Sequence, residues 1–205
     1  MKTIEVYGKY ACFTRPELSV ERVTYDIITP SAARNIYQSI FWKPKINWQI
    51  SKIEILNPIK HAYLKRNEVS STSKNSIYIE DNRCQKGSII LKDVRYRITA
   101  DLIYNGELTK KENPGKYIGM FDKRASKGAC FKQPYLGCRE FSCNFKFIEN
   151  LNNLDEPINL TTNLGLMFYD YNYEDKSRLF FEAKVQNGVM NIPEKNSDKI
   201  YKKAN

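Results

Sequence analysis

The chain has 205 residues, 41% of them apolar, and a formal charge of +10. Its length suits one domain, or one domain with a small appendage, and its charge favours a polyanionic partner, with nucleic acid ahead of an anionic membrane surface. The five cysteines form no C-x-x-C pair, which argues against a disulfide framework or a zinc site and indicates a reducing compartment.

The first third of the chain predicts a strand, a helix and a second strand. Apolar residues alternate with others from residue 3 to 7, which is typical of a half-buried strand. After a link over residues 10–28, Thr29 can cap a helix that begins at Pro30. A strand follows through Trp48, and a change of parity in its apolar residues predicts a bulge near Ser51-Lys52. The helix carries an apolar stripe made of Ala33, Ile36, Tyr37, Ile40 and Phe41.

The middle of the chain predicts a polar excursion and then a long strand. Residues 65–86 are rich in Ser, Asn and Lys, which indicates a hairpin or loop. Residues 94–104 alternate apolar and polar over their whole length, and Asn105-Gly106 should end that strand in a tight turn.

A basic stretch over residues 110–141 follows, with eight Lys or Arg against three acids. Asn113 can cap a helix whose first residue is Pro114, and Gly128 can end it in the left-handed conformation. A helix N-terminus offers N–H groups to an anion, and Lys116 stands at that end. A phosphate held there would meet N–H groups and an ammonium together.

These elements predict an α+β fold in two parts. The order strand, helix, strand, strand, helix, strand over residues 1–148 is the βαββαβ order of ferredoxin-like and RNA-recognition modules. Residues 149–163 are Asn-rich and acidic and indicate a linker. The rest of 149–205 predicts a small antiparallel β appendage, with a hairpin that turns at Asn187-Gly188, and a frayed tail.

Several kinds of chemistry lack support in the sequence. His61 is the one histidine and cannot form a metal cluster, and no D-x-D or paired-carboxylate motif stands out. Phosphate-cradling G-x-G-x-x-G and Walker motifs are absent. The first ten residues lack the apolar run of a signal peptide, and no stretch approaches the ~20 apolar residues of a membrane span, so we expect neither. We therefore expect a cytoplasmic protein without metal or cofactor.

Basic residues interleaved with tyrosines favour binding of RNA or another single strand, because phosphates pair with cations and bases stack on rings. The candidates for phosphate contact are Lys9, Arg15, Arg22, Arg34, Lys43, Arg66, Arg124, Lys127, Lys132 and Arg139.

Seven blocks of sequence, in order, resemble the CRISPR-associated Cas-five family of the type I-C (Dvulg) subtype, in the RAMP superfamily. The blocks are V-Y-G-K-Y-A-C-F-T-R-P-E (6–17), V-E-R-V-T-Y-D-I-I-T-P-S-A-A-R (20–34), S-I-F-W-K-P (39–44), L-K-R-N-E-V (64–69), L-K-D-V-R-Y-R-I (91–98), N-P-G-K-Y (113–117) and Q-P-Y-L-G-C-R-E-F (133–141).

The resemblance implies an endoribonuclease that cuts repeat hairpins of pre-crRNA without metal. It also implies that the protein stays bound to the crRNA 5′ handle beside the backbone and large subunits of a Cascade surveillance complex. Two alternatives remain, namely a handle-binding subunit that does not cut, and a generic basic scaffold protein.

The family's catalytic trio is a tyrosine in S-I-Y-W-K-P and the lysine and histidine of G-K-H. Carried over, these positions are Phe41, Lys116 and Tyr117, so only the lysine is retained. Tyr37, one turn before Phe41, is a candidate substitute for the missing tyrosine. The implied roles are stabilisation of the phosphorane by Lys116 and partial replacement of the imidazole by Tyr117. A phenol ionises near pH ~10 and is a poor base near neutral pH.

Overall fold

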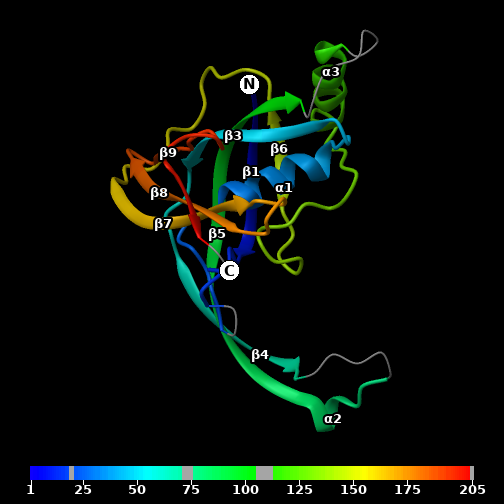
Figure 1. The fold of residues 1–205 in the computed structure, drawn as a ribbon, viewed down its shortest axis with the longest axis vertical. Coiled ribbons are helices and arrows are strands. Elements are labelled where there is room, and N and C mark those ends of the chain that lie inside the picture. Colours follow the sequence, from blue (N-terminus) through cyan, green and yellow to red (C-terminus); the bar gives the residue numbers. More distant parts are fainter. Residues whose placement is uncertain (19–20, 71–75, 105–112, 204–205) are drawn as a thin grey trace.

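The computed structural model describes residues 1–18, 21–70, 76–104 and 113–203, which form a mixed α/β fold with a large antiparallel sheet and few helices (Figure 1). The predicted turn at Asn105-Gly106 lies outside these residues. The helices are α1 (Pro30–Ile40), α2 (Ile79–Asn82) and α3 (Pro114–Ala125). The strands are β1 (Lys2–Ala11), β2 (Arg22–Val23), β3 (Ile46–Ile55), β4 (His61–Val69), β5 (Arg83–Tyr104), β6 (Asn144–Ile148), β7 (Thr162–Tyr171), β8 (Arg178–Gln186), β9 (Val189–Asn191) and β10 (Ile200–Lys203).

The centre of the sheet has the strand order β3-β5-β1-β6, and each neighbouring pair is antiparallel. Ile4, Ile53 and Ile98 lie opposite one another on one face, and all three are fully buried. The two long helices join this core through aromatic packing, since Tyr37 of α1 stacks on Phe121 of α3 with ring centroids 5.6 Å apart. Alternation along the strands therefore places the apolar face under α1 and α3.

The local predictions for both helix starts are confirmed. The Thr29 side chain accepts a hydrogen bond from the Ala32 N–H, and the Asn113 side chain accepts one from the Gly115 N–H at 2.8 Å. Gly128 has a φ of 64°, in the left-handed region that favours glycine, just after the end of α3. The predicted bulge is also present, because the pairing of β3 with β5 shifts between Ile50 and Lys52.

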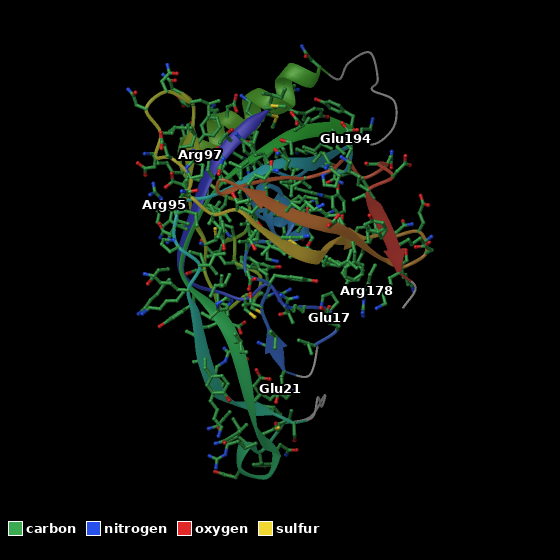
Figure 2. All side chains as sticks on the ribbon, turned by 90° about the vertical axis from the view of Figure 1, so that its left-hand side faces the viewer. Glu17, Glu21, Arg95, Arg97, Arg178 and Glu194 are labelled. Atoms are coloured by element: carbon green, nitrogen blue, oxygen red, sulfur yellow. The ribbon has the colours of Figure 1, made fainter. Side chains whose placement is uncertain are left out.

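The polar excursion is a hairpin made by β4 and the first half of β5, and it extends far from the body of the protein (Figures 1 and 2). Exposed and half-buried residues alternate along β4, as expected for a two-stranded ribbon with water on one face. The second half of β5 returns into the central sheet.

The C-terminal strands extend the same sheet, because β9 pairs with β3 and with β8. Asn187 and Gly188 have φ values of 48° and 75°, which confirms the predicted turn. The tail was predicted to fray, but residues 200–203 form β10 and pair with β8, so that prediction is wrong for them. The division of the chain at residue 148 stays a prediction.

The segment predicted to be a linker is held against the sheet. Arg95 donates to the Asp155 carboxylate at 2.6 Å, and Arg97 donates to the Asp155 carbonyl at 2.6 Å. Both arginines lie on β5, on the face opposite the helices, and Figure 2 shows them on one side of the body. Residues 149–157 therefore form a strap over the sheet, which we call the 149–157 strap.

Candidate functional site

The positions of the implied catalytic trio meet where the end of α1 faces the start of α3. The ring centroids of Phe41 and Tyr117 are 6.5 Å apart, although the two residues are far apart in the sequence. Lys116, next to Tyr117 in the first turn of α3, is exposed. A phosphate at this place could approach the exposed Lys116 ammonium beside a phenol and an aromatic ring.

Phe41 is the C-cap residue of α1, and two hydrogen bonds fix its backbone. Its N–H donates to the Tyr37 carbonyl at 2.9 Å, and its carbonyl accepts from the Trp48 indole N–H at 3.2 Å. The ring is 2% exposed and has no proton to donate. The position of the family tyrosine is thus well fixed, but in this chain it contributes packing alone.

Tyr37 does not substitute for the missing tyrosine. Its side chain is fully buried, and its hydroxyl lies 2.7 Å from the Ile98 carbonyl and 2.9 Å from the Lys2 carbonyl. Burial also raises the pKa of Tyr37 well above its ordinary value. The expectation of a catalytic Tyr37 is contradicted by this placement, since a substrate cannot reach the side chain.

Tyr104, at the end of β5, belongs to this site and was missed from the sequence. Its ring centroid lies 6.2 Å from that of Tyr117. Desolvation and the neighbouring Tyr117 raise the pKa of Tyr104 above its ordinary value, so this phenol stays protonated near neutral pH. The available signal was its position as the last alternating residue before the turn predicted at Asn105-Gly106.

The first N–H groups of α3 are occupied. The Gly115 N–H is bound by the Asn113 side chain, and the Lys116 N–H is bound by the Asn113 carbonyl at 3.0 Å. Pro114 has no N–H to offer. The expected phosphate cradle of helix N–H groups is therefore largely filled by the cap, and the exposed Lys116 ammonium is a cationic group that the described residues place at this end.

Four of the predicted RNA contacts are engaged in ion pairs, and the longest of these pairs joins Arg15 to Glu17 at 4.0 Å. Arg22 and Arg66 both donate to the Glu140 carboxylate, at 2.8 Å and 2.6 Å. Arg34 forms a two-fold pair with Asp170, with one contact of 3.0 Å, and the two side chains are only 15% and 6% exposed. Arg34 is therefore a structural residue between α1 and β7, which contradicts its assignment to RNA. For Arg22 and Arg66 the pairing reduces the charge available to a phosphate.

The other candidates lie nearer to solvent. Lys9, Lys43, Lys127, Lys132 and Arg139 are exposed. Two further arginines have partial structural roles. Arg15 lies over the Tyr25 ring at 4.5 Å, and exposed Arg124 donates to the Ile40 carbonyl at 3.3 Å. All seven keep a positive charge at the surface, and their contact with RNA stays a prediction.

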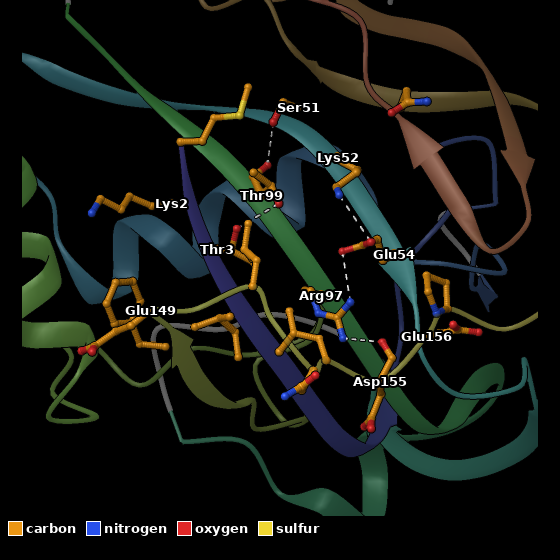
Figure 3. A pocket seen from close by; sticks show the side chains of 18 of the residues that line it. Lys2, Thr3, Ser51, Lys52, Glu54, Arg97, Thr99, Glu149, Asp155 and Glu156 are labelled. Atoms are coloured by element: carbon orange, nitrogen blue, oxygen red, sulfur yellow. Dashed lines mark hydrogen bonds and ion pairs between the residues drawn. The ribbon is translucent and has the colours of Figure 1, made fainter.

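A cavity of about 920 Å³ lies between the sheet and the 149–157 strap (Figure 3). Arg97, 4% exposed, donates to the Asp155 carbonyl and lies 3.5 Å from the Glu54 carboxylate, which also pairs with Lys52. Three Lys or Arg side chains line the cavity against five carboxylates, which belong to Glu54, Asp122, Glu149, Asp155 and Glu156. This negative balance does not suit an RNA backbone.

Metal-ligand clusters and membrane-spanning helices are both absent from the ranges that the structure describes. No three His, Cys, Asp or Glu side chains gather there as a metal site, and His61 instead lies 3.1 Å from the Asp26 carboxylate. In the same ranges, the helices are too short and too polar to cross a membrane.

Comparison with known proteins identifies close relatives over nearly the whole chain. Residues 3–193 match the model of a family described as CRISPR-associated protein (Cas_Cas5). A protein named CRISPR pre-crRNA endoribonuclease Cas5d from Mannheimia succiniciproducens is 43% identical over 211 aligned positions, which cover 93% of each chain. A protein of the same name from Thermus thermophilus is 34% identical and covers 97% of this chain and 94% of its own.

Solved structures share the fold at lower sequence identity. A structure described as that of a CRISPR-associated protein has a TM-score of 0.74 at 20% identity and covers 98% of this chain and 95% of its own. The functionally uncharacterized protein SMU1763c from Streptococcus mutans has a TM-score of 0.72 at 20% identity, with 98% and 96% coverage. These likenesses show the fold alone.

Proposed function

Because the chain belongs to the CRISPR-associated Cas5d family, we propose that it is an endoribonuclease that cuts the repeat hairpins of pre-crRNA. The observation that carries the proposal is the meeting of Phe41, Lys116 and Tyr117 at one place, in a chain 43% identical to a pre-crRNA endoribonuclease. We propose further that the core strands and helices form a ferredoxin-like unit, which the strand order β3-β5-β1-β6 supports.

The proposed reaction is an internal displacement on phosphorus. The 2′-oxygen of one nucleotide loses its proton and bonds to the adjacent phosphorus, and the bond to the 5′-oxygen breaks. The products are a 2′,3′-cyclic phosphate and a 5′-hydroxyl that has gained a proton. Lys116 stabilises the negative charge on the phosphorane oxygens, and the Tyr117 hydroxyl donates to the phosphorane or to the leaving oxygen. No metal ion is required in this scheme.

After cleavage, the protein stays bound to the crRNA 5′ handle as a subunit of a type I-C Cascade complex. The exposed basic residues support this part of the proposal, because retention of an RNA product needs phosphate contacts.

The experiment compares wild type with Lys116→Ala on a repeat hairpin in EDTA, with Lys199→Ala as the matched loss of one exposed lysine that lies outside the predicted RNA contacts. We expect Lys116→Ala to slow cleavage by about 10²–10³-fold and Lys199→Ala to change it little. A hairpin with a 2′-deoxy at the cut site should bind and remain intact.

The outcomes separate the alternatives. Binding of the hairpin without any scission would favour a handle-binding subunit that does not cut. Weak binding with no preference for the repeat hairpin over other RNA would favour a basic scaffold. Cleavage that stops in EDTA and returns with magnesium would disprove the metal-free scheme.

A further inference from the structure

Two large aromatic side chains are exposed beside the proposed cleavage site. Trp42, directly after Phe41, is 52% exposed, and Phe131, in the loop after α3, is 76% exposed. Aromatic rings of this size usually find cover in a folded protein, so a pair of them in water at one place indicates a binding surface.

Contacts at the end of α1 bring the two residues into one region. The Ser39 carbonyl accepts from the Phe131 N–H at 2.7 Å and from the Lys132 N–H at 3.2 Å. Ser39 lies in the last turn of α1, and Trp42 follows that turn. The loop that carries Phe131 is therefore attached to the same helix end that carries Trp42.

The backbone around both rings is fixed, so the exposed rings are presented from rigid supports. Phe41, which precedes Trp42, is held through its N–H by Tyr37 and through its carbonyl by Trp48. Two hydrogen bonds to Ser39 hold the loop at Phe131. A ring on a fixed backbone loses little conformational freedom when a ligand covers it.

The two chain segments that carry the rings are basic. Residues 39–45 and 123–133 contain no Asp or Glu. Their six basic residues are Lys43, Lys45, Lys123, Arg124, Lys127 and Lys132. Exposed rings among cations suit a single strand of nucleic acid, since bases stack on the rings while phosphates pair with the charges. A protein partner with an apolar patch would not require this charge.

We propose that Trp42 and Phe131 form a stacking platform for unpaired nucleotides next to the cleaved bond of the repeat hairpin, an inference that rests on the function proposed above. Trp42 adjoins Phe41, whose ring lies 6.5 Å from that of Tyr117, so a base on Trp42 lies close to the reacting phosphate. Both aromatics are positioning residues that fix the register of the strand, and neither takes part in proton transfer.

The intrinsic fluorescence of the protein reports on this platform directly. The chain has two tryptophans, and Trp48 is 2% exposed in the core, so a change caused by bound RNA arises at Trp42. Titration with an uncleavable repeat hairpin, with 2′-deoxy at the cut site and single-stranded flanks, should quench the emission. Flanks made abasic should restore it while the stem still binds. Emission that is unaffected by intact flanks would overturn the platform.

Affinity measurements with matched variants test the energetics. Trp42→Ala and Phe131→Ala should each raise the Kd for the flanked hairpin about tenfold, with an unchanged dependence on salt. Lys132→Ala should instead weaken the dependence of log Kd on log salt by about one unit. With abasic flanks the two aromatic variants should bind as wild type does, whereas misfolded variants would bind every RNA poorly. Trp42→Phe should retain most of the affinity.

The result can be separated from a failure of the proposed function. Wild type that neither binds nor cuts repeat hairpins would overturn the function, and the platform with it. The platform alone would be overturned if wild type cuts normally and the Trp42→Ala and Phe131→Ala variants keep its affinity and cut position. The exposed rings would then bind something other than this RNA.

Discussion

The Phe41 ring lies 6.5 Å from the Tyr117 ring, and this contact joins the end of α1 to the first turn of α3. The buried Phe41 and the candidate proton donor Tyr117 are therefore neighbours in the site. The resemblance implies a catalytic tyrosine at the position of Phe41 and a catalytic histidine at that of Tyr117. The two side chains at these implied positions contact each other.

We predict that Phe41→Tyr increases the rate of hairpin cleavage. The added hydroxyl would stand beside Tyr117 and supply the hydrogen-bond donor that the family motif has there. Proton transfer or donation by one positioned group is worth about 10²–10⁴-fold, and a rise of at least about tenfold is expected because the wild type already has Tyr104 and Tyr117 nearby. Single-turnover kinetics measure it, and a stable variant with an unchanged rate would remove this position from the mechanism.

We predict that Arg34→Met reduces stability without altering the salt dependence of RNA binding. The variant leaves the Asp170 carboxylate buried and unpaired, and loss of one partner of a buried ion pair costs about 3–5 kcal/mol. Urea unfolding gives the free energy of unfolding, and a salt titration gives the slope of RNA binding. A stable variant with a slope reduced by about one unit would return Arg34 to the RNA interface.

We predict that Arg97→Met destabilises the protein more than Arg95→Met. Arg97 is 4% exposed, and its loss leaves the Asp155 carbonyl without a donor and removes one of two cations from Glu54. Arg95 has a side chain that is 31% exposed, so water screens its ion pairs. Urea unfolding of the matched pair measures the difference, and equal losses would show that burial of Arg97 contributes nothing.

We predict that Glu140 contributes stability only above acidic pH. Burial acts to raise the pKa of this carboxyl, but the hydrogen bond from Arg66 and the charges of Arg66 and Arg22 outweigh it, so the pKa is lowered from 4.5. A lowered pKa in the folded state gives stability that is present above the unfolded pKa and is lost as pH falls through the folded value.

The corresponding measurement compares urea midpoints of wild type and Glu140→Gln between pH 7 and pH 3. The gap between them should be largest near neutral pH and should shrink below a pH of about 4.5. A gap that stays constant over this range would show that the carboxylate charge is not what Arg22 and Arg66 stabilise.

Features that depend on a few neighbouring residues were predicted from the sequence. The caps at Thr29 and Asn113, the bulge near Ser51-Lys52 and the turn at Asn187-Gly188 are all present. Each of them is fixed by contacts within a few positions or by one residue's φ preference, so the residue pattern contains the needed information.

The roles of individual charged and aromatic side chains could not be predicted in this way. The sequence pattern predicted that Arg34 is a surface cation and that Tyr37, one turn from Phe41, is a candidate donor. Asp170 lies in a strand far along the chain, and the carbonyls that hold Tyr37 belong to β1 and β5. Likewise, residues 200–203 form β10 because their backbone pairs with residues 178–181 of β8.

The amino-acid sequence alone determined the basic character, the main strands and helices of the core, and membership of a family, because composition, periodicity and ordered motifs are properties of the chain itself. Tertiary structure alone decided which cations remain exposed, which tyrosines reach the site and what lies opposite Tyr117. Burial and ion pairing depend on distant segments that meet only when the sheet assembles, and no local pattern encodes those meetings.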